Sequence, residues 1–137
     1  MTIFSVMLLH VAWFITWGGS VMASCTMADA KSLGGAMIYS CLFYLGPILS
    51  LPSHPLGKAG LIASLPLCLA LIWQTAWGMK LFVIVNVDGL SACNLMMGEG
   101  YGEARGGWIE ALYAPYYTLV SVSSLVAILL SYRRHRQ

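Results

Sequence analysis

Long apolar segments separated by short polar ones make up most of the chain. The apolar segments cover residues 3–24, 34–51, 59–87 and 111–132, and polar, proline or glycine residues lie between them. Each segment is close to, or longer than, the roughly 20 residues that a helix needs to cross the hydrocarbon core of a bilayer. The pattern therefore predicts an all-α fold, an integral membrane four-helix bundle that forms a single transmembrane domain over residues 1–137.

The composition supports lipid as the main solvent of the chain. Hydrophobic residues make up 59% of the 137 residues and charged residues only 9%, whereas a soluble domain carries roughly a quarter charged residues. The net charge of +2 is too small to indicate a nucleic-acid partner. We expect membrane lipid to surround the helices and no nucleic acid to bind.

The distribution of charge predicts the orientation of the helices. Arg133, Arg134 and Arg136 lie in the C-terminal tail, and Lys and Arg near the ends of spans mark the cytoplasmic side. An even number of spans then places both termini in the cytoplasm. Residues 88–110, here called the acidic loop, hold four of the five acidic residues and would face outward. We predict a multi-pass protein of the bacterial inner membrane with this loop in the periplasm.

The cysteines divide into two pairs. Cys25 and Cys93 would both lie on the non-cytoplasmic face, where disulfides persist, and we predict a disulfide between them. Cys41 and Cys68 lie within spans, where cysteine behaves as a small apolar side chain.

Polar residues inside a span are functional candidates by default, and here they are His10, Gln74 and Lys80. Two interpretations of Lys80 are open. Its stem can let the ammonium snorkel toward the outer interface, or the ammonium can pair with Asp88 or a loop glutamate. We favour snorkelling because it needs no partner.

His10 shares a helical stripe with Trp13, Phe14 and Trp17. A histidine flanked by aromatic rings could ligate haem b or a metal. The alternative is that its ring nitrogens bond to a neighbouring helix and the aromatic rings only pack. We favour packing, since a metal site needs more ligands than one histidine.

The sequence from His10 to Trp17, Gly18 and Gly19 resembles the first helix of small four-helix membrane proteins of the CopD copper-resistance and HemJ protoporphyrinogen-oxidase type. The resemblance implies a haem or metal ligand at His10. HemJ-type proteins also use a lysine in a later helix, which Lys80 would match. From the residues alone, however, His10 lies near the cytoplasmic end of its helix and Lys80 in the outer half of another. We therefore expect the two not to share a site.

The acidic loop mixes charge with aromatic side chains, a composition typical of contact surfaces. We predict a partner-binding site at Glu99, Tyr101, Glu103 and Trp108. No convergent catalytic set and no metal cluster is evident, so the residues favour a protein without catalytic activity. By architecture, the chain resembles small polytopic immunity proteins against pore-forming bacteriocins or membrane-targeting effectors of type VI secretion.

Two other function classes are weighed against this prediction. The alternative is a haem- or metal-binding membrane protein of the CopD/HemJ type, with haem b at His10. A small cation or drug transporter is the least favoured class, because such transporters carry a membrane-embedded glutamate in their first helix. The first span here has no acidic residue.

Overall fold

The structure is a computed structural model that describes residues 2–23, 29–92 and 107–135. Within these residues all regular elements are helical, and the four longest are each long and apolar enough to cross a membrane. The all-helical, four-helix part of the expected fold is therefore confirmed. The elements are α1 (Thr2–Ala23), α2 (Asp29–Ser50), the 3-10 turn η1 (Leu51–Ser53), α3 (Lys58–Phe82), the π-helical turn η2 (Val83–Val87) and α5 (Trp108–His135).

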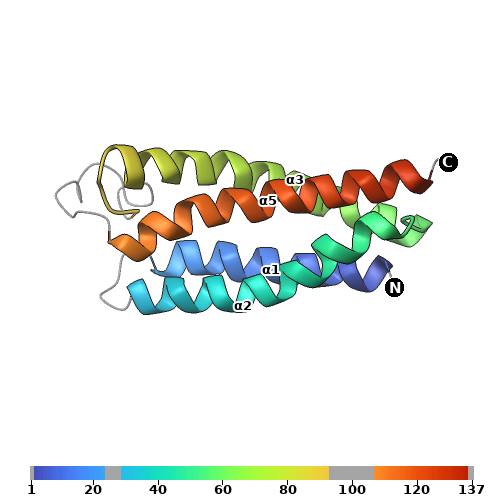
Figure 1. Cartoon of the computed structure of the whole chain (residues 1–137), viewed down its shortest axis with the longest axis horizontal. Coiled ribbons are helices and arrows are strands. Elements are labelled where there is room, and N and C mark those ends of the chain that lie inside the picture. The colour runs from blue at the N-terminus through green and yellow to red at the C-terminus, as the bar shows by residue number, and fades with distance from the viewer. Residues whose placement is uncertain (1, 24–28, 93–106, 136–137) are drawn as a thin grey trace.

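The four helices form a bundle of two antiparallel pairs (Figure 1). Helix α1 packs along α2, and α3 packs along α5. Contacts between α2 and α5 and between α1 and α3 join the pairs, so that α1 and α5 lie nearly diagonal to one another. Helices α1 and α2, and helices α3 and α5, are therefore neighbours in the sequence that pack antiparallel, whereas the consecutive helices α2 and α3 lie across the bundle from one another.

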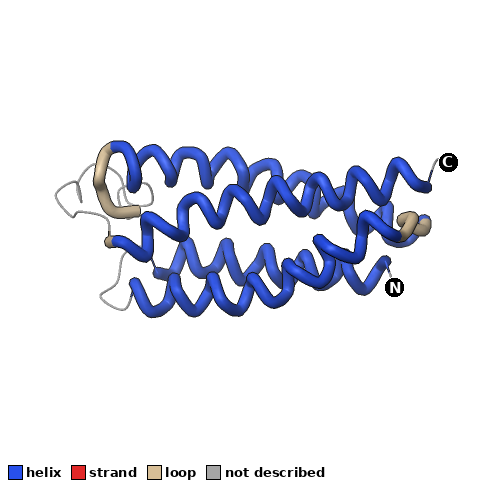
Figure 2. Tube along the Cα trace, in the orientation of Figure 1, coloured by secondary structure: helices blue, strands red, loops and turns tan. Residues whose placement is uncertain are grey.

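The two ends of the bundle differ (Figure 2). The beginning of α1, the turn η1 and the last turn of α5 lie at one end, here called the terminal end. The end of α1, the turn η2 and the start of α5 lie at the other, here called the loop end. At the terminal end the Ser131 hydroxyl donates a hydrogen bond to the His54 carbonyl and ties α5 to the connection between α2 and α3.

Two helices begin earlier than the sequence suggested. Helix α2 starts at Asp29 rather than near residue 34, and Gly34 and Gly35 lie inside it. A glycine in a helix costs only about 1 kcal/mol, so these two residues do not mark the start of the helix. Helix α5 starts at Trp108 rather than 111, and the Ala111 amide donates to the Gly107 carbonyl at 3.0 Å. The last three residues of the acidic loop are therefore helical.

Apolar side chains cover the outside of the bundle. Leu49, Leu69 and Ile62 expose 73%, 72% and 71% of their surface, whereas Thr16 and Gln74 are fully buried. Soluble proteins show the opposite preference, with large aliphatic side chains inside and amides mostly outside. A surface of this kind suits hydrocarbon rather than water.

Two glycines allow the helices of each pair to approach closely. A Cβ at Gly19 of α1 would lie 2.4 Å from the Ala36 Cβ of α2. A Cβ at Gly78 of α3 would lie 2.5 Å from the Thr118 hydroxyl oxygen of α5. Small residues at such contacts are typical of helices packed in membranes.

Candidate functional site

A buried layer of hydroxyl and amide groups crosses the centre of the bundle. Thr16 of α1 and Tyr44 of α2 share a hydrogen bond of 3.0 Å between their hydroxyls. The Tyr113 hydroxyl of α5 donates to the Thr16 carbonyl. All three side chains expose 1% or less of their surface. Because buried polar groups must be paired, this arrangement favours one relative position of α1, α2 and α5.

Gln74 adds the fourth helix to this layer. Its side chain is fully buried in α3, and its Nε2 atom lies 3.4 Å from the Tyr117 carbonyl, a long hydrogen bond. The amide also lies within reach of the Tyr44 hydroxyl. Its Oε1 atom has no hydrogen-bond partner among the described residues. Gln74, one of the three polar residues expected inside a span, is therefore in the core.

A second cross-helix contact joins α5 to α2. The Tyr116 hydroxyl of α5 donates to the Met37 carbonyl of α2 at 3.2 Å, and its oxygen lies 2.8 Å from the Ser40 hydroxyl. Ser121 and Ser124 instead bond within α5, to the carbonyls four residues earlier, at 2.8 and 2.7 Å. The Tyr116 contact joins two helices, whereas Ser121 and Ser124 only satisfy the hydrogen-bonding needs of their own hydroxyls.

Glu110 holds the two described ends of the acidic loop together. Its carboxylate is buried, with 8% of the residue exposed. One oxygen accepts a hydrogen bond from the Ser91 hydroxyl at 3.2 Å, and the other accepts one from the Ala92 amide at 3.0 Å. Hydrogen bonds to an ionised carboxylate are stronger than neutral ones. Glu110 is therefore part of the framework rather than of a solvated loop surface.

One of the four residues expected to bind a partner is described. Trp108 opens α5 at the loop end and exposes 74% of its surface. The other three, Glu99, Tyr101 and Glu103, lie outside the described residues. An exposed tryptophan beside an anchored loop is available for contact with a protein or with the membrane interface.

His10 bonds to its own helix rather than to a neighbouring one. Its Nδ1 atom donates to the Val6 carbonyl at 2.9 Å. The stripe of aromatic rings packs along the same helix, where Trp13 and Trp17 stack with ring centroids 6.0 Å apart and Phe14 lies 6.2 Å from Trp17. Among the described residues, no group of three His, Cys, Asp or Glu side chains could hold a metal.

His10 and Lys80 lie at different heights in the bundle. A Cβ at Gly60 of α3 would be 4.0 Å from the Thr2 hydroxyl of α1, which sets the register of these two parallel helices. His10, eight residues beyond Thr2, is then level with Cys68, and Lys80 is twelve residues further along α3. At 1.5 Å per residue the difference is roughly 18 Å. This register supports the expectation that they do not share a site.

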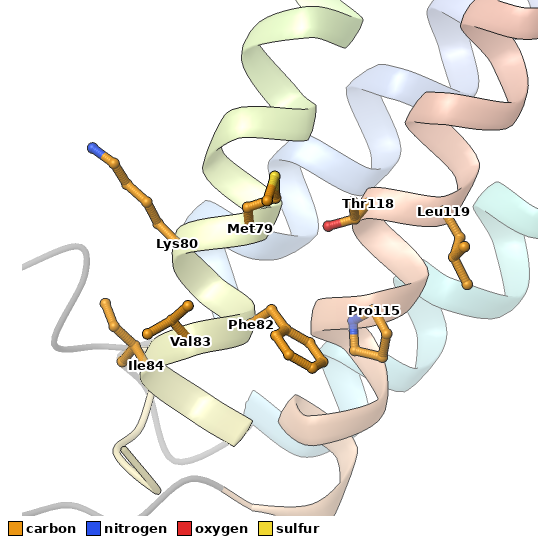
Figure 3. Close-up of a pocket in the computed structure, with 8 residues that line it drawn as sticks. All are labelled: Met79, Lys80, Phe82, Val83, Ile84, Pro115, Thr118 and Leu119. Carbon is orange, nitrogen blue, oxygen red and sulfur yellow. The ribbon is translucent and has the colours of Figure 1, made fainter. Parts of the chain in front are cut away.

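Lys80 is exposed on the outside of α3, not inside the bundle. It lines an apolar groove between α3, η2 and α5, and its side chain extends away from α5 (Figure 3). Of the cysteines, Cys41 and Cys68 are free and half-buried in their helices, as expected. Cys25 and Cys93 lie outside the described residues, so their disulfide stays a prediction.

The tyrosines of the polar layer were not singled out in the sequence. Tyr113 and Tyr117 are four residues apart in α5, and their rings lie 5.7 Å apart by centroid. A hydroxyl in an apolar segment needs a partner when buried, and this requirement was the available signal. It does not say which helix supplies that partner.

Comparisons with protein-family models, with characterised proteins and with solved structures find no match to this chain. The residues of the chain itself are therefore the basis for the function proposed below.

Proposed function

We propose that the chain is a four-span protein of the bacterial inner membrane that binds a membrane-acting protein at its acidic loop and protects the membrane. In this role it would act as an immunity protein against a pore-forming bacteriocin or a membrane-targeting type VI secretion effector. The apolar outer surface supports insertion. The expected topology, with both termini cytoplasmic, would turn the loop end toward the periplasm, where an incoming toxin arrives.

The anchored base of the acidic loop is the observation that favours this function. Glu110 draws Ser91 and Ala92 to the start of α5, so the intervening segment leaves from and returns to one fixed place. Trp108 is exposed beside that place. Fixing the ends of a binding segment lowers the entropy lost when a partner orders it. The polar layer, by contrast, is enclosed by four helices and offers no exposed surface to a protein.

Replacing Glu99, Tyr101, Glu103 and Trp108 with alanine tests this proposal. Protection against the cognate toxin should be lost and toxin binding weakened by roughly thirtyfold or more, because truncating central interface residues costs about 2 kcal/mol or more each. The amount of protein in the membrane should not change. A control with Ser53→Ala and His54→Ala, both exposed at the terminal end, should protect fully. A loop variant that still protects would contradict the proposal.

A disulfide between Cys25 and Cys93 would add a second restraint to the loop end. Closing so long a segment is expected to stabilise that end by about 3 to 4 kcal/mol. Thiol labelling of the denatured, non-reduced protein should then find two reactive cysteines, Cys41 and Cys68. Four reactive cysteines would show that the disulfide does not form.

One observation favours haem binding as a second candidate function. The bond from Nδ1 of His10 to the Val6 carbonyl leaves Nε2 as the atom that could ligate iron, and ligating histidines commonly hold their other nitrogen in this way. The fit is incomplete, because the described residues contain no set of three His, Cys, Asp or Glu side chains that could hold a metal ion together with His10. Haem binding predicts a Soret band in the purified protein that His10→Ala removes. The same variant should leave protection intact if the first proposal is right.

A further inference from the structure

An apolar groove of about 660 Å³ runs along the outside of α3, η2 and α5 near the loop end (Figure 3). Helix α3 and η2 supply one wall and α5 supplies the other. Phe82 reaches across toward Pro115, and Met79 lies opposite Thr118 (Figure 3). The lining residues are Met79, Lys80, Phe82, Val83, Ile84, Pro115, Thr118 and Leu119.

Both walls of the groove depart from regular α-helical geometry. On one side α3 continues into the π-helical turn Val83–Val87. Such turns are rare in proteins, and those that occur are often at functional sites. On the other side Pro115 lies inside α5, where it has no amide to donate to the carbonyl four residues earlier. Gly78 of α3 lies close to Thr118 of α5, so the two helices are in contact at the edge of the groove.

Lys80 is the one charged residue of the groove lining. It is exposed and makes no ion pair with another described residue. The segment Lys58–Val87 is 30 residues long, and Lys80 lies roughly 11 Å along the helix from its middle at 1.5 Å per residue. Half the thickness of the hydrocarbon core is about 15 Å. The Lys80 side chain thus leaves the helix inside the apolar zone, where an unpaired cation is costly, and its ammonium is within reach of lipid phosphates.

We propose that this groove binds an anionic phospholipid, with an acyl chain against the apolar walls and the phosphate on the Lys80 ammonium. The inference rests on the membrane insertion proposed above, but not on the immunity function. Charge complementarity selects this occupant. The walls suit hydrocarbon, and Lys80, which extends from the edge of α3 away from α5 (Figure 3), is the one cation of the lining that an anion joined to hydrocarbon could meet. Lys80 then has a partner without reaching the aqueous phase alone.

The experiment uses the full-length protein in nanodiscs that contain equal amounts of phosphatidylglycerol and phosphatidylcholine. After extraction into mild detergent, native mass spectrometry counts the lipids of each kind that stay bound. The wild type should retain phosphatidylglycerol in preference to phosphatidylcholine. Lys80→Gln should lower that preference about fivefold, the factor that corresponds to the attraction of one lysine to an anionic membrane. Lys80→Arg keeps the charge and should keep the preference.

Two controls separate the groove from general effects of charge and size. Lys58→Gln removes the same charge at the other end of α3 and should leave lipid retention unchanged. Val83→Trp fills the groove and should reduce retention of both lipids, whereas Leu69→Trp places the same side chain at an exposed position outside the groove lining and should leave retention unchanged.

Several results would overturn the proposal. These are equal retention of the two lipids by the wild type, an unchanged preference in Lys80→Gln, and equal effects of the two tryptophan variants. Circular dichroism of each purified variant confirms that its helices are intact. Loss of toxin protection plays no part in these readouts, so the immunity function and the lipid site can fail independently.

Discussion

At the scale of single residues, hydroxyl groups that bond to other helices hold the bundle together. The Tyr113 hydroxyl bonds to the Thr16 carbonyl of α1, and the Tyr116 hydroxyl bonds to the Met37 carbonyl of α2. Apolar contacts between helices resemble the contacts that the same side chains would make with lipid tails, so they discriminate poorly among arrangements. A hydrogen bond made across two helices discriminates better, because a shifted helix leaves a buried group unpaired.

Tyr113→Phe should therefore destabilise the bundle by about 0.5 to 1.5 kcal/mol, the net value of one such hydrogen bond. The ring and its packing are retained, so only the bond to Thr16 is lost. The matched control is Tyr39→Phe, because Tyr39 lies on α2 with 63% of its surface exposed. Unfolding of both variants by dodecyl sulfate in mixed micelles measures the difference. Equal losses would mean that the Tyr113 hydroxyl contributes nothing specific.

The sequence predicts the residues of the site unevenly, for a physical reason. Gln74 stands out because an amide in an apolar segment is costly wherever it lies, and it is buried. Tyr113 does not stand out, because a tyrosine also suits a lipid interface. The role of Glu110 was hidden as well, since a carboxylate beside glycines usually belongs to a solvated loop. Only the fold brings Ser91 and Ala92 to it.

At the scale of helices, the close approach of α3 to α5 depends on Gly78. A Cβ there would also lie 3.0 Å from the Tyr117 ring, so the neighbouring helix would have to move. Gly35 of α2 offers a contrast, because a Cβ there meets nothing within 4 Å. The same substitution at these two positions should therefore have effects of opposite sign.

Gly78→Ala should destabilise the protein by about 1 to 3 kcal/mol, the usual cost of adding a methyl group to a packed contact. Gly35→Ala should stabilise it by up to about 1 kcal/mol, since alanine is the better helix former. The same dodecyl sulfate titration gives both values. Stabilisation by Gly78→Ala would show that α3 and α5 are not held at the observed distance.

The number of long helices was predictable, while their ends were not. Apolar length alone indicates four spans, and the residues that the structure describes form four such helices. The first turns of α2 and α5 were missed because charged or glycine-rich residues hide a helix that extends past the apolar segment. Residues 83–87 belong to the third span as expected, but their π-helical form has no signature in the residue types.

At the scale of the whole molecule, charge differs between the two ends of the bundle. Lys58, Arg133 and Arg134 are exposed at the terminal end. Asp88 and Glu110 lie at the loop end, and no acidic residue among those that the structure describes lies at the terminal end. The packing of the helices does not depend on which end faces the cytoplasm. Orientation therefore rests on this asymmetry, which the positive-inside rule converts into a prediction.

Reporter fusions after Ser32, Lys58, Arg105 and Gln137 should alternate between periplasmic and cytoplasmic signals, beginning with periplasmic. Alkaline phosphatase is active only outside the cytoplasm and green fluorescent protein only inside, so paired fusions at each site report the side twice. A variant with Arg133, Arg134 and Arg136 changed to glutamine removes the strongest cytoplasmic signal and should yield a mixed orientation. A periplasmic signal after Gln137 in the unaltered chain would reverse the orientation. The acidic loop would then face the cytoplasm, and a toxin arriving from outside could not meet it.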